Sequence, residues 1–205
     1  MTTNQKPSES LESIFTKFLL HRVNAKYPPD FPPPPINKKK TLIFDLDDTL
    51  IHSSDTPPNP GIDSFKTGVL GFYVFKRPGL DKFMEKFSKI YDIFIFTSGD
   101  RDYADPIINV ICPFVDLQHR LYRSSCTIEN NKIHKDIDAF KRPKNKIILI
   151  EDNPAIKKDH PDNTIIVPKW NLSSKDTILI DWLPKILDNC AKSSDVRDII
   201  RNIKV

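Results

Sequence analysis

The fold is decided by the segment Thr41-Leu-Ile-Phe-Asp-Leu-Asp-Asp-Thr-Leu-Ile51, which joins an apolar run to a group of oxygen-bearing side chains. We predict a buried strand over residues 41–46. In an extended chain, residues two apart point to the same side, so Asp45, Asp47 and Thr49 would face one ligand. Neighbouring carboxylates repel each other and raise one pKa unless a cation lies between them. The segment therefore predicts a nucleophilic carboxylate, an acid–base carboxylate and a site for Mg²⁺, a cation that prefers oxygen ligands.

The same segment has a simpler interpretation, a buried strand followed by a solvated turn, because Asp and Thr are ordinary turn residues. The rest of the chain has to decide between the two.

The composition is ordinary for a soluble globular protein. The chain has 205 residues, of which 39% are hydrophobic and 28% charged, enough for one domain with a sizeable core or for a domain plus an arm. We expect no membrane span and no signal segment. The three cysteines, which form no CxxC pair, are expected to be reduced thiols, and this favours a nuclear or cytoplasmic location. The net charge of +4 suits a phosphorylated partner without indicating direct binding of nucleic acid.

Residues 1–40 differ in composition from the remainder of the chain. Apolar residues at helical spacing predict a short amphipathic helix, formed by Leu11, Ile14, Phe15, Phe18 and Leu19. The prolines that follow, between residues 28 and 35, favour an extended polyproline arm. We expect a second unit, the globular domain, over residues 41–205.

From residue 41 onward, short apolar strands alternate with helical segments. Unbroken apolar strands separated by helices predict an α/β fold, with a central parallel sheet flanked by helices and a small β insertion. The expected strands cover residues 41–46, 72–75, 93–96, 147–150 and 165–167, the expected helices cover 80–90, 103–112, 176–190 and 195–203, and a hairpin is expected within 121–134.

Polar side chains follow each of the three strongest predicted strands. They are Asp45 and Asp47, then Thr97 and Ser98, then Glu151, Asp152 and Asn153. Ligands of open α/β sheets bind outside the carboxyl ends of the strands. We therefore expect the three groups to meet at one crevice, and this convergence supports the catalytic interpretation of the first segment.

Taken together, these motifs resemble the haloacid dehalogenase-like superfamily and, within it, the FCP/SCP group of RNA polymerase II C-terminal-domain phosphatases. The matching stretches are Phe44-Asp-Leu-Asp-Asp-Thr-Leu-Ile-His-Ser53, Lys76-Arg-Pro-Gly79, Phe96-Thr-Ser98, Tyr103-Ala-Asp-Pro106, Leu121-Tyr-Arg-Ser-Ser-Cys126, Lys135-Asp136 and His160-Pro-Asp-Asn163. The first motif indicates the superfamily, and the whole series indicates the group. The resemblance runs from about residue 41 to residue 190 and leaves the first 40 residues uncovered.

The resemblance assigns roles to the two carboxylates of the first motif. Asp45 would be the nucleophile that forms an aspartyl-phosphate. Asp47 would protonate the leaving alkoxide and later deprotonate the attacking water. Mg²⁺ would be held by the Asp45 carboxylate, the Asp47 backbone carbonyl and an acidic residue after the third strand. Thr49 would shape the loop by hydrogen bonding.

Other positions would contact phosphate or substrate by the same resemblance. Thr97, and less directly Ser98, would bind a phosphoryl oxygen, the alternative being simple capping of the strand end. Lys135 would supply a fixed positive charge. Arg123 would either support the site or form a structural ion pair.

The acidic residues after the third strand allow two alignments with the family pattern. Without a gap, Asp152 is the metal ligand and Glu151 is its acidic neighbour, which could orient Lys135. With one deletion, Asp152 and Asn153 take those two roles. We prefer the first alignment, and Asp152 belongs to the site in both.

The resemblance also implies a substrate, the RNA polymerase II C-terminal domain or a similar phosphoprotein. The insertion at 52–76 and the hairpin would wall the crevice, with Tyr103 as a substrate-binding residue. Asp55 and Asp100 replace apolar residues that would accept a proline, so the preferred phosphosite is left open. The alternatives are an inactive relative that acts as a binding scaffold and a phosphatase of small phosphoesters or nucleic-acid ends.

Overall fold

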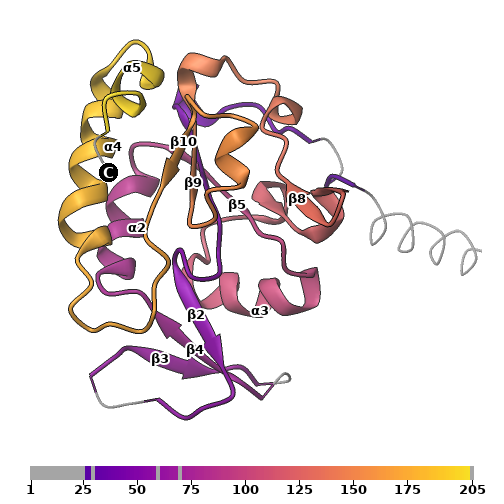
Figure 1. Cartoon of the computed structure of the whole chain (residues 1–205), viewed down its shortest axis with the longest axis vertical. Helices are drawn as coiled ribbons and strands as arrows, with labels where there is room; N and C mark the ends of the chain where they lie inside the picture. Colours follow the sequence, from indigo (N-terminus) through magenta and orange to yellow (C-terminus); the bar gives the residue numbers. More distant parts are fainter. Residues whose placement is uncertain (1–25, 29–30, 59–60, 69–70, 204–205) are drawn as a thin grey trace, which may run out of the picture.

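A five-stranded parallel sheet forms the centre of the computed structural model, which describes residues 26–28, 31–58, 61–68 and 71–203. Its strands are β1 (Thr41–Phe44), β5 (Asp92–Phe96), β6 (Arg120–Leu121), β9 (Ile147–Glu151) and β10 (Thr164–Ile166), in the order β10-β9-β1-β5-β6. The strand β1 lies in the middle and pairs in parallel with β5 and β9 (Figure 1). The predicted fold class is confirmed.

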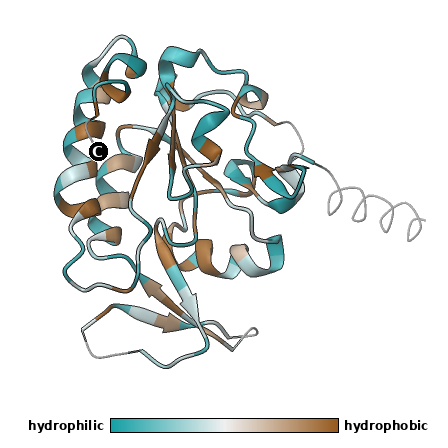
Figure 2. Cartoon of the chain, in the orientation of Figure 1, coloured by the Kyte–Doolittle hydropathy of each residue, from teal (hydrophilic) through white to brown (hydrophobic). Residues whose placement is uncertain are grey.

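Both faces of the sheet are buried, because successive residues of its strands enter two separate hydrophobic clusters. Leu42 and Phe44 belong to the first cluster and Ile43 to the second. Figure 2 shows the resulting hydrophobic colour along the central strands. Burial on both faces is typical of parallel sheets and explains the unbroken apolar runs of the sequence.

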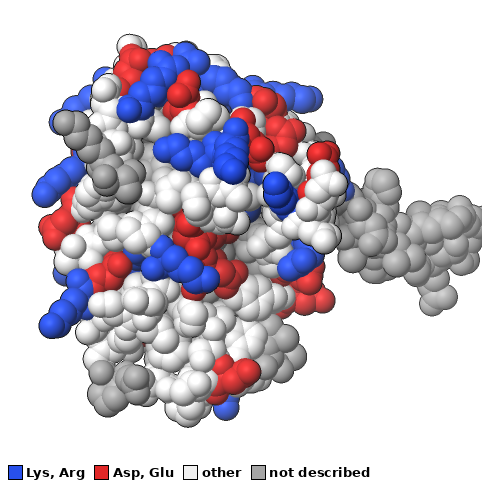
Figure 3. All heavy atoms as spheres, in the orientation of Figure 1, with Lys and Arg blue, Asp and Glu red and all other residues white. Residues whose placement is uncertain are grey.

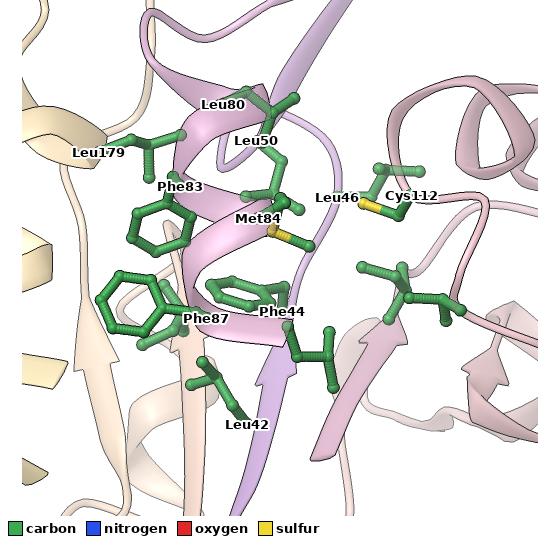
Figure 4. Close-up of a cluster of buried hydrophobic side chains, with 14 of the residues drawn as sticks. Leu42, Phe44, Leu46, Leu50, Leu80, Phe83, Met84, Phe87, Cys112 and Leu179 are labelled. Carbon is green, nitrogen blue, oxygen red and sulfur yellow. The ribbon is translucent and has the colours of Figure 1, made fainter. Parts of the chain in front are cut away.

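The α-helices supply the first cluster. The helices are α2 (Leu80–Ser88), α3 (Arg101–Ile111), α4 (Leu183–Lys192) and α5 (Val196–Ile200), and a π-helical turn, η7 (Ile178–Trp182), precedes α4. In Figure 4, Phe83, Met84 and Phe87 of α2 pack over Phe44, and Leu179 approaches from η7. The helical face thus covers the strand that leads into the first motif.

The second cluster is covered by short turns and by the proline arm. The 3-10 turns η4 (Asp138–Phe140) and η6 (Ile156–Lys158) contribute Phe140 and Ile156. Phe31 of the arm meets Phe94 and Phe140 edge to face, with ring centroids 6.4 and 5.1 Å apart. The described part of the arm therefore packs on the domain, whereas the helix predicted from Leu11 to Leu19 lies outside the described residues.

Further 3-10 turns occur in the connections, at η1 (Ile36–Lys38), η2 (Leu117–His119), η3 (Arg123–Ser125) and η5 (Lys144–Lys146). No helix among the described segments combines the length and the apolar character that crossing a bilayer requires.

Two small antiparallel sheets accompany the central sheet, one below it and one to its right in the view of Figure 1. One has the order β2-β4-β3, with β2 (Ile51–Ser54), β3 (Ser64–Lys66) and β4 (Tyr73–Lys76). The other is the hairpin of β7 (Thr127–Glu129) and β8 (Lys132–His134), whose turn residues Asn130 and Asn131 have positive φ angles of 50° and 59°. Asparagine tolerates this left-handed conformation, so the Asn-Asn pair explains the tight turn.

The predicted C-terminal elements need correction. Residues 176–190 do not form one regular helix, because η7 precedes α4 and the helix extends to Lys192. Pro184 lies in the first turn of α4, where a missing N–H breaks no helical hydrogen bond. The last helix is shorter than the predicted 195–203 and ends at Ile200.

Candidate active site

The loop after β1 bends sharply at Asp48, which has a left-handed φ of 57°. The Asp45 N–H continues the sheet by donating to the Ile150 carbonyl at 2.9 Å. The Asp48 and Leu50 N–H groups donate within the loop, to Ile51 and Leu46. Asp45 is therefore fixed at the end of the strand and Asp47 at the start of the turn, as the spacing of the motif predicts.

Lys135 lies between two buried carboxylates. Its ammonium is 2.6 Å from Oδ1 of Asp45 and 2.7 Å from Oε2 of Glu151, and its side chain is 2% exposed. Burial lowers the pKa of Lys135, but the charges of Asp45 and Glu151 outweigh it and raise that pKa, so the ammonium stays protonated. The structure thus brings together residues that are 90 positions apart in the chain.

Burial also changes the two carboxylates of the first motif. Desolvation raises the pKa of Asp45 to about 6, although Lys135 opposes this, and it raises the pKa of Asp47 to about 6 as well. Carboxyl groups that titrate near neutral pH suit acid–base chemistry. For Asp47, the raised pKa means that a substantial fraction is protonated near pH 6.

Tyr103 reaches Asp47 from α3. Its hydroxyl donates to Oδ1 of Asp47 and lies 2.7 Å from the hydroxyl of Ser53 in β2. The ring stacks on Phe72, with centroids 5.5 Å apart and an interplanar angle of 26°. Tyr103 therefore joins α3, the small sheet and the acid–base candidate, in addition to the substrate contact expected for it.

The end of β9 distinguishes its three polar residues. Glu151 pairs with Lys135, as in the alignment without a gap. Asp152 is half-buried, and burial together with the charge of Asp45 raises its pKa. Asn153 is exposed, and its side-chain oxygen accepts the Ala155 N–H at 3.0 Å. This geometry favours Asp152 over Asn153 as the ligand at the third strand.

The donor set fits a hard divalent cation. Carboxylate oxygens of Asp45, Glu151 and Asp152 lie within 4.8 Å of one another. Three carboxylates facing one ammonium leave excess negative charge, and oxygen ligands of this kind suit Mg²⁺. A second group of potential metal ligands consists of Asp136, Asp138 and His160. Lys144 forms an ion pair with Asp138, so a side-chain cation already offsets negative charge there.

The remaining predicted residues lie around this centre. Thr97 is fully buried, and its hydroxyl accepts the Gly99 N–H at 2.9 Å, the geometry of a strand-end cap. Ser98 lines the same cavity as Asp45, Asp47 and Lys135. Arg123 is half-exposed and lies 3.6 Å from Asp100, so the structure places it in an ion pair at the rim. The hydroxyl of Thr49 is buried without a hydrogen-bond partner among the described residues, contrary to its expected role in the loop.

Sequence reasoning missed a group of polar side chains around Asp48, which includes His52 and Lys169. The Asp48 carboxylate lies 2.5 Å from Nδ1 of His52 and 2.7 Å from the ammonium of Lys169. The Asp48 carbonyl accepts the Trp170 N–H at 2.8 Å. No motif links residue 48 with residues 169 and 170, so only the fold brings them together.

Arg77 is the other residue whose role was missed. It is fully buried, and its guanidinium donates to the Thr49 and Pro168 carbonyls and forms a paired contact with the Asp176 carboxylate at 2.9 and 2.8 Å. A planar guanidinium is suited to such forked contacts. Arg77 therefore connects the loop of the first motif with the loop before the C-terminal helices.

A cavity of about 400 Å³ is lined by Asp45, Asp47, Ser98, Lys135 and the polar residues at the end of β9. It is bounded by the first motif, the end of β9, Lys135 and Lys169. Figure 3 shows acidic side chains gathered between the central sheet and the small β2-β4-β3 sheet, with basic side chains beside them. The carboxyl ends of the central parallel strands thus carry a group of carboxylates around one buried ammonium.

The sequence profile of the NLI interacting factor-like phosphatases matches residues 40–197, and the chain belongs to that family. The family predicted from the motifs is thereby confirmed. Phosphatase PSR1 of Saccharomyces cerevisiae is 33% identical over 79% of this chain and 39% of its own length. The human carboxy-terminal domain RNA polymerase II polypeptide A small phosphatase 1 is 30% identical over 80% of this chain and 64% of its own length. The chain thus spans about two-fifths to two-thirds of the length of these relatives.

Solved structures agree with the fold. The structure of Fcp1, described as an essential RNA polymerase II CTD phosphatase, has a TM-score of 0.52 and 24% identity, and the match covers 77% of this chain and 46% of that one. Fission yeast Fcp1 bound to beryllium fluoride has a TM-score of 0.52 and 19% identity, over 94% of this chain and 66% of that one.

Proposed function

We propose that this chain is a Mg²⁺-dependent protein serine/threonine phosphatase that works through an aspartyl-phosphate on Asp45. The observation that carries the proposal is the contact of Lys135 with both Asp45 and Glu151, beside Asp47 and Asp152. A protein that served only as a scaffold would have no need to bury several carboxylates around one ammonium, since burying charge costs free energy.

In the first half of the reaction, a carboxylate oxygen of Asp45 attacks the phosphorus atom of a phosphoserine or phosphothreonine. The bond from phosphorus to the substrate oxygen breaks, and that oxygen takes a proton from Asp47. The raised pKa of Asp47, caused first by burial, favours the protonated form that this step needs. Lys135 holds the Asp45 carboxylate in place and stabilises negative charge as the phosphoryl group arrives.

In the second half, Asp47 accepts a proton from water, and the water oxygen attacks phosphorus. Inorganic phosphate leaves, and the Asp45 carboxylate is restored. The residues that would hold Mg²⁺ are Asp45 and Asp152, with the Asp47 backbone carbonyl. When bound, Mg²⁺ supplies positive charge that offsets the charge of the phosphoryl group.

The substrate proposed for this site is a phosphoprotein, either the RNA polymerase II C-terminal domain or one of similar character. The support comes from the relatives, two of which carry that polymerase domain in their names. A substrate of this class is compatible with the nuclear or cytoplasmic location expected from the cysteines.

The proposal is tested by turnover assays at a series of Mg²⁺ concentrations. The substrates are an aryl phosphate and then phosphoserine peptides with and without a following proline. We expect Asp45→Asn to lower kcat on the order of a thousandfold or more, and Asp47→Asn by at least about a hundredfold. Asp198→Asn, which changes an exposed carboxylate on α5, serves as the matched control.

Activity that survives Asp45→Asn would rule out the nucleophile assignment. Turnover of sugar phosphates or nucleotides far above every peptide would instead favour a phosphatase of small phosphoesters. Full activity in the presence of a chelator would remove Mg²⁺ from the mechanism.

A further inference from the structure

We propose that Lys169 is a specificity-determining residue, whose ammonium binds an anionic side chain of the substrate next to the scissile phosphate. The preferred substrate would then carry a second acidic group, a phosphate or a carboxylate, close to the phosphoserine or phosphothreonine. This inference rests on the proposed phosphatase function and adds a preference to it.

The two lysines that line the catalytic cavity differ in what they can contact. Lys135 is 2% exposed and is held between two carboxylates, so it serves the interior of the site. The side chain of Lys169 is 68% exposed and lies at the mouth. Lys169 is therefore placed to meet a part of the substrate that stays outside the cavity.

The position of Lys169 is fixed through its neighbour. Trp170 is 1% exposed, its backbone N–H donates to the Asp48 carbonyl at 2.8 Å, and its indole N–H donates to the Ser173 carbonyl at 3.1 Å. The residue that carries the ammonium is thus anchored to the loop that bears Asp45 and Asp47. A substrate anion bound by Lys169 would therefore be held at a defined position relative to the reacting phosphate.

Lys169 keeps donors free for a ligand. An ammonium has three protons, and among the described residues the carboxylate in contact with Lys169 is that of Asp48, at 2.7 Å. This single contact also restricts a long side chain, which lowers the entropy that binding has to remove. The hydrogen bond and charge of Asp48 raise the pKa of Lys169, so the cation persists at neutral pH.

The need to neutralise Asp48 does not by itself explain the presence of a lysine at position 169. The same carboxylate has a second partner, Nδ1 of His52, at 2.5 Å. Asp48 would remain hydrogen-bonded if Lys169 turned toward a substrate. The exposed ammonium can therefore exchange part of its contact for a phosphate or carboxylate while the half-buried Asp48 carboxylate keeps its hydrogen bond to His52.

The test compares three phosphoserine peptides that are identical except at one flanking position, which holds phosphoserine, Glu or Ala. Their kcat/KM values are measured for the wild type, Lys169→Gln, Lys169→Glu and the rescue variant Lys169→Arg. Lys175→Gln, an exposed lysine of the same loop, is the matched control. Binding of the same peptides to Asp45→Asn, with and without Lys169→Gln, is measured by calorimetry, because it does not depend on turnover.

We expect the wild type to prefer the flanking anion by roughly fivefold over Ala, the upper range for a partly exposed ion pair. Lys169→Gln should abolish the preference, Lys169→Glu should reverse it, and Lys169→Arg and Lys175→Gln should retain it. The phosphoserine and Glu peptides show which anion is preferred. If Lys169→Gln changes kcat/KM by the same factor for all three peptides, Lys169 is merely structural and the inference is overturned.

The outcome separates this inference from the proposed function. Hydrolysis of all peptides without a preference that depends on Lys169 would sink the specificity role and leave the phosphatase intact. If no peptide is hydrolysed, the proposed function fails, and the calorimetry still decides whether Lys169 binds the flanking anion. Equal affinities with and without Lys169→Gln would overturn the inference in that case too.

Discussion

The hydroxyl of Tyr103 donates a hydrogen bond to the carboxylate of Asp47, from a residue 56 positions further along the chain. The carboxylate that would move protons is therefore held by α3, an element separate from its own loop. Because Tyr103 also contacts Ser53, the orientation of Asp47 depends on the packing of α3 against the small sheet. This dependence leads to a prediction about rate and pH.

Replacing Tyr103 by Phe should lower kcat/KM by about two- to tenfold, the range for one net hydrogen bond. It should also raise the pKa of Asp47, because that pKa, already raised by burial to about 6, is held down by the Tyr103 hydroxyl. A higher pKa keeps Asp47 protonated at higher pH, so the alkaline limb of the kcat/KM profile should shift to higher pH. Steady-state rates between about pH 5 and 9 measure both effects.

Tyr122→Phe is the matched control for this change. It removes a hydroxyl that donates at 2.6 Å to Asp105 instead of Asp47, so the alkaline limb should not move. A Tyr103→Phe profile that superimposes on the wild type would show that the hydrogen bond has no part in catalysis.

Lys135→Met should destabilise the protein by about 3–5 kcal/mol in the absence of divalent cations, because it leaves Asp45 and Glu151 buried without their ammonium. Added Mg²⁺ should restore part of this loss by binding the folded state. Urea unfolding with and without Mg²⁺ measures both quantities. Lys132→Met, which changes an exposed lysine of the hairpin that precedes Lys135, should have little effect. Equal stabilities for the two variants would refute the structural role of Lys135.

Asp152→Asn should raise the Mg²⁺ concentration required for half-maximal activity by about tenfold or more, since it removes a charged oxygen ligand. Asn153→Ala should leave that concentration nearly unchanged and lower stability by about 1 kcal/mol, because its side chain caps the Ala155 N–H. Metal titrations of activity distinguish the two. The reverse order of effects would assign the metal to Asn153 and revive the alignment with a deletion.

A fourth prediction concerns His119, far from the reacting groups in sequence. Burial lowers its pKa, but hydrogen bonds to Asp92 and Asp116, with separations of 3.1 and 2.6 Å, outweigh burial and raise it above 6.5. A pKa raised in the folded state contributes stability that is complete below pH 6.5 and is lost as the pH rises through the folded pKa. The free energy of unfolding should therefore fall over that interval, by up to about 1.4 kcal/mol per unit of pKa difference.

Urea unfolding at about pH 6 and pH 8.5 measures this loss. His119→Gln should remove the part of the pH dependence that comes from this group, and Asp116→Asn should reduce it. An unchanged slope in His119→Gln would mean that other groups produce it.

The sequence was sufficient for four of the five strands of the central sheet and for bringing most of the candidate site residues together. The predicted hairpin over 121–134 was too long, because Leu121 belongs to the short central strand β6 and the hairpin covers Thr127–His134. Apolar runs buried on both faces have few alternatives to a parallel sheet, so β1, β5, β9 and β10 were predicted to within about two residues. Because parallel strands end at one edge, Asp45, Asp47 and Asp152 could be placed together before the structure was known. The pairing of Glu151 with Lys135 was anticipated from the family pattern alone.

Other features have no local signal. The strand β2 is half-exposed and lacks alternation between apolar and polar residues, so it and β3 were not predicted. The contact between Tyr103 and Asp47 depends on how α3 meets the small sheet, which no spacing in the sequence encodes. The left-handed turn at Asp48 and its contact with Lys169 likewise follow from tertiary packing.

The guanidinium of Arg77 means that the catalytic loop and the start of the C-terminal helices are mechanically one piece. A substitution at Asp176 would leave the buried guanidinium of Arg77 without its carboxylate partner. A shift of the guanidinium would then change its hydrogen bond to the Thr49 carbonyl, two residues from Asp47, although no reacting group is altered. Lysine could not reproduce three partners with a single point charge. Redesign of the substrate loops of this domain should therefore keep both Arg77 and Asp176 unchanged.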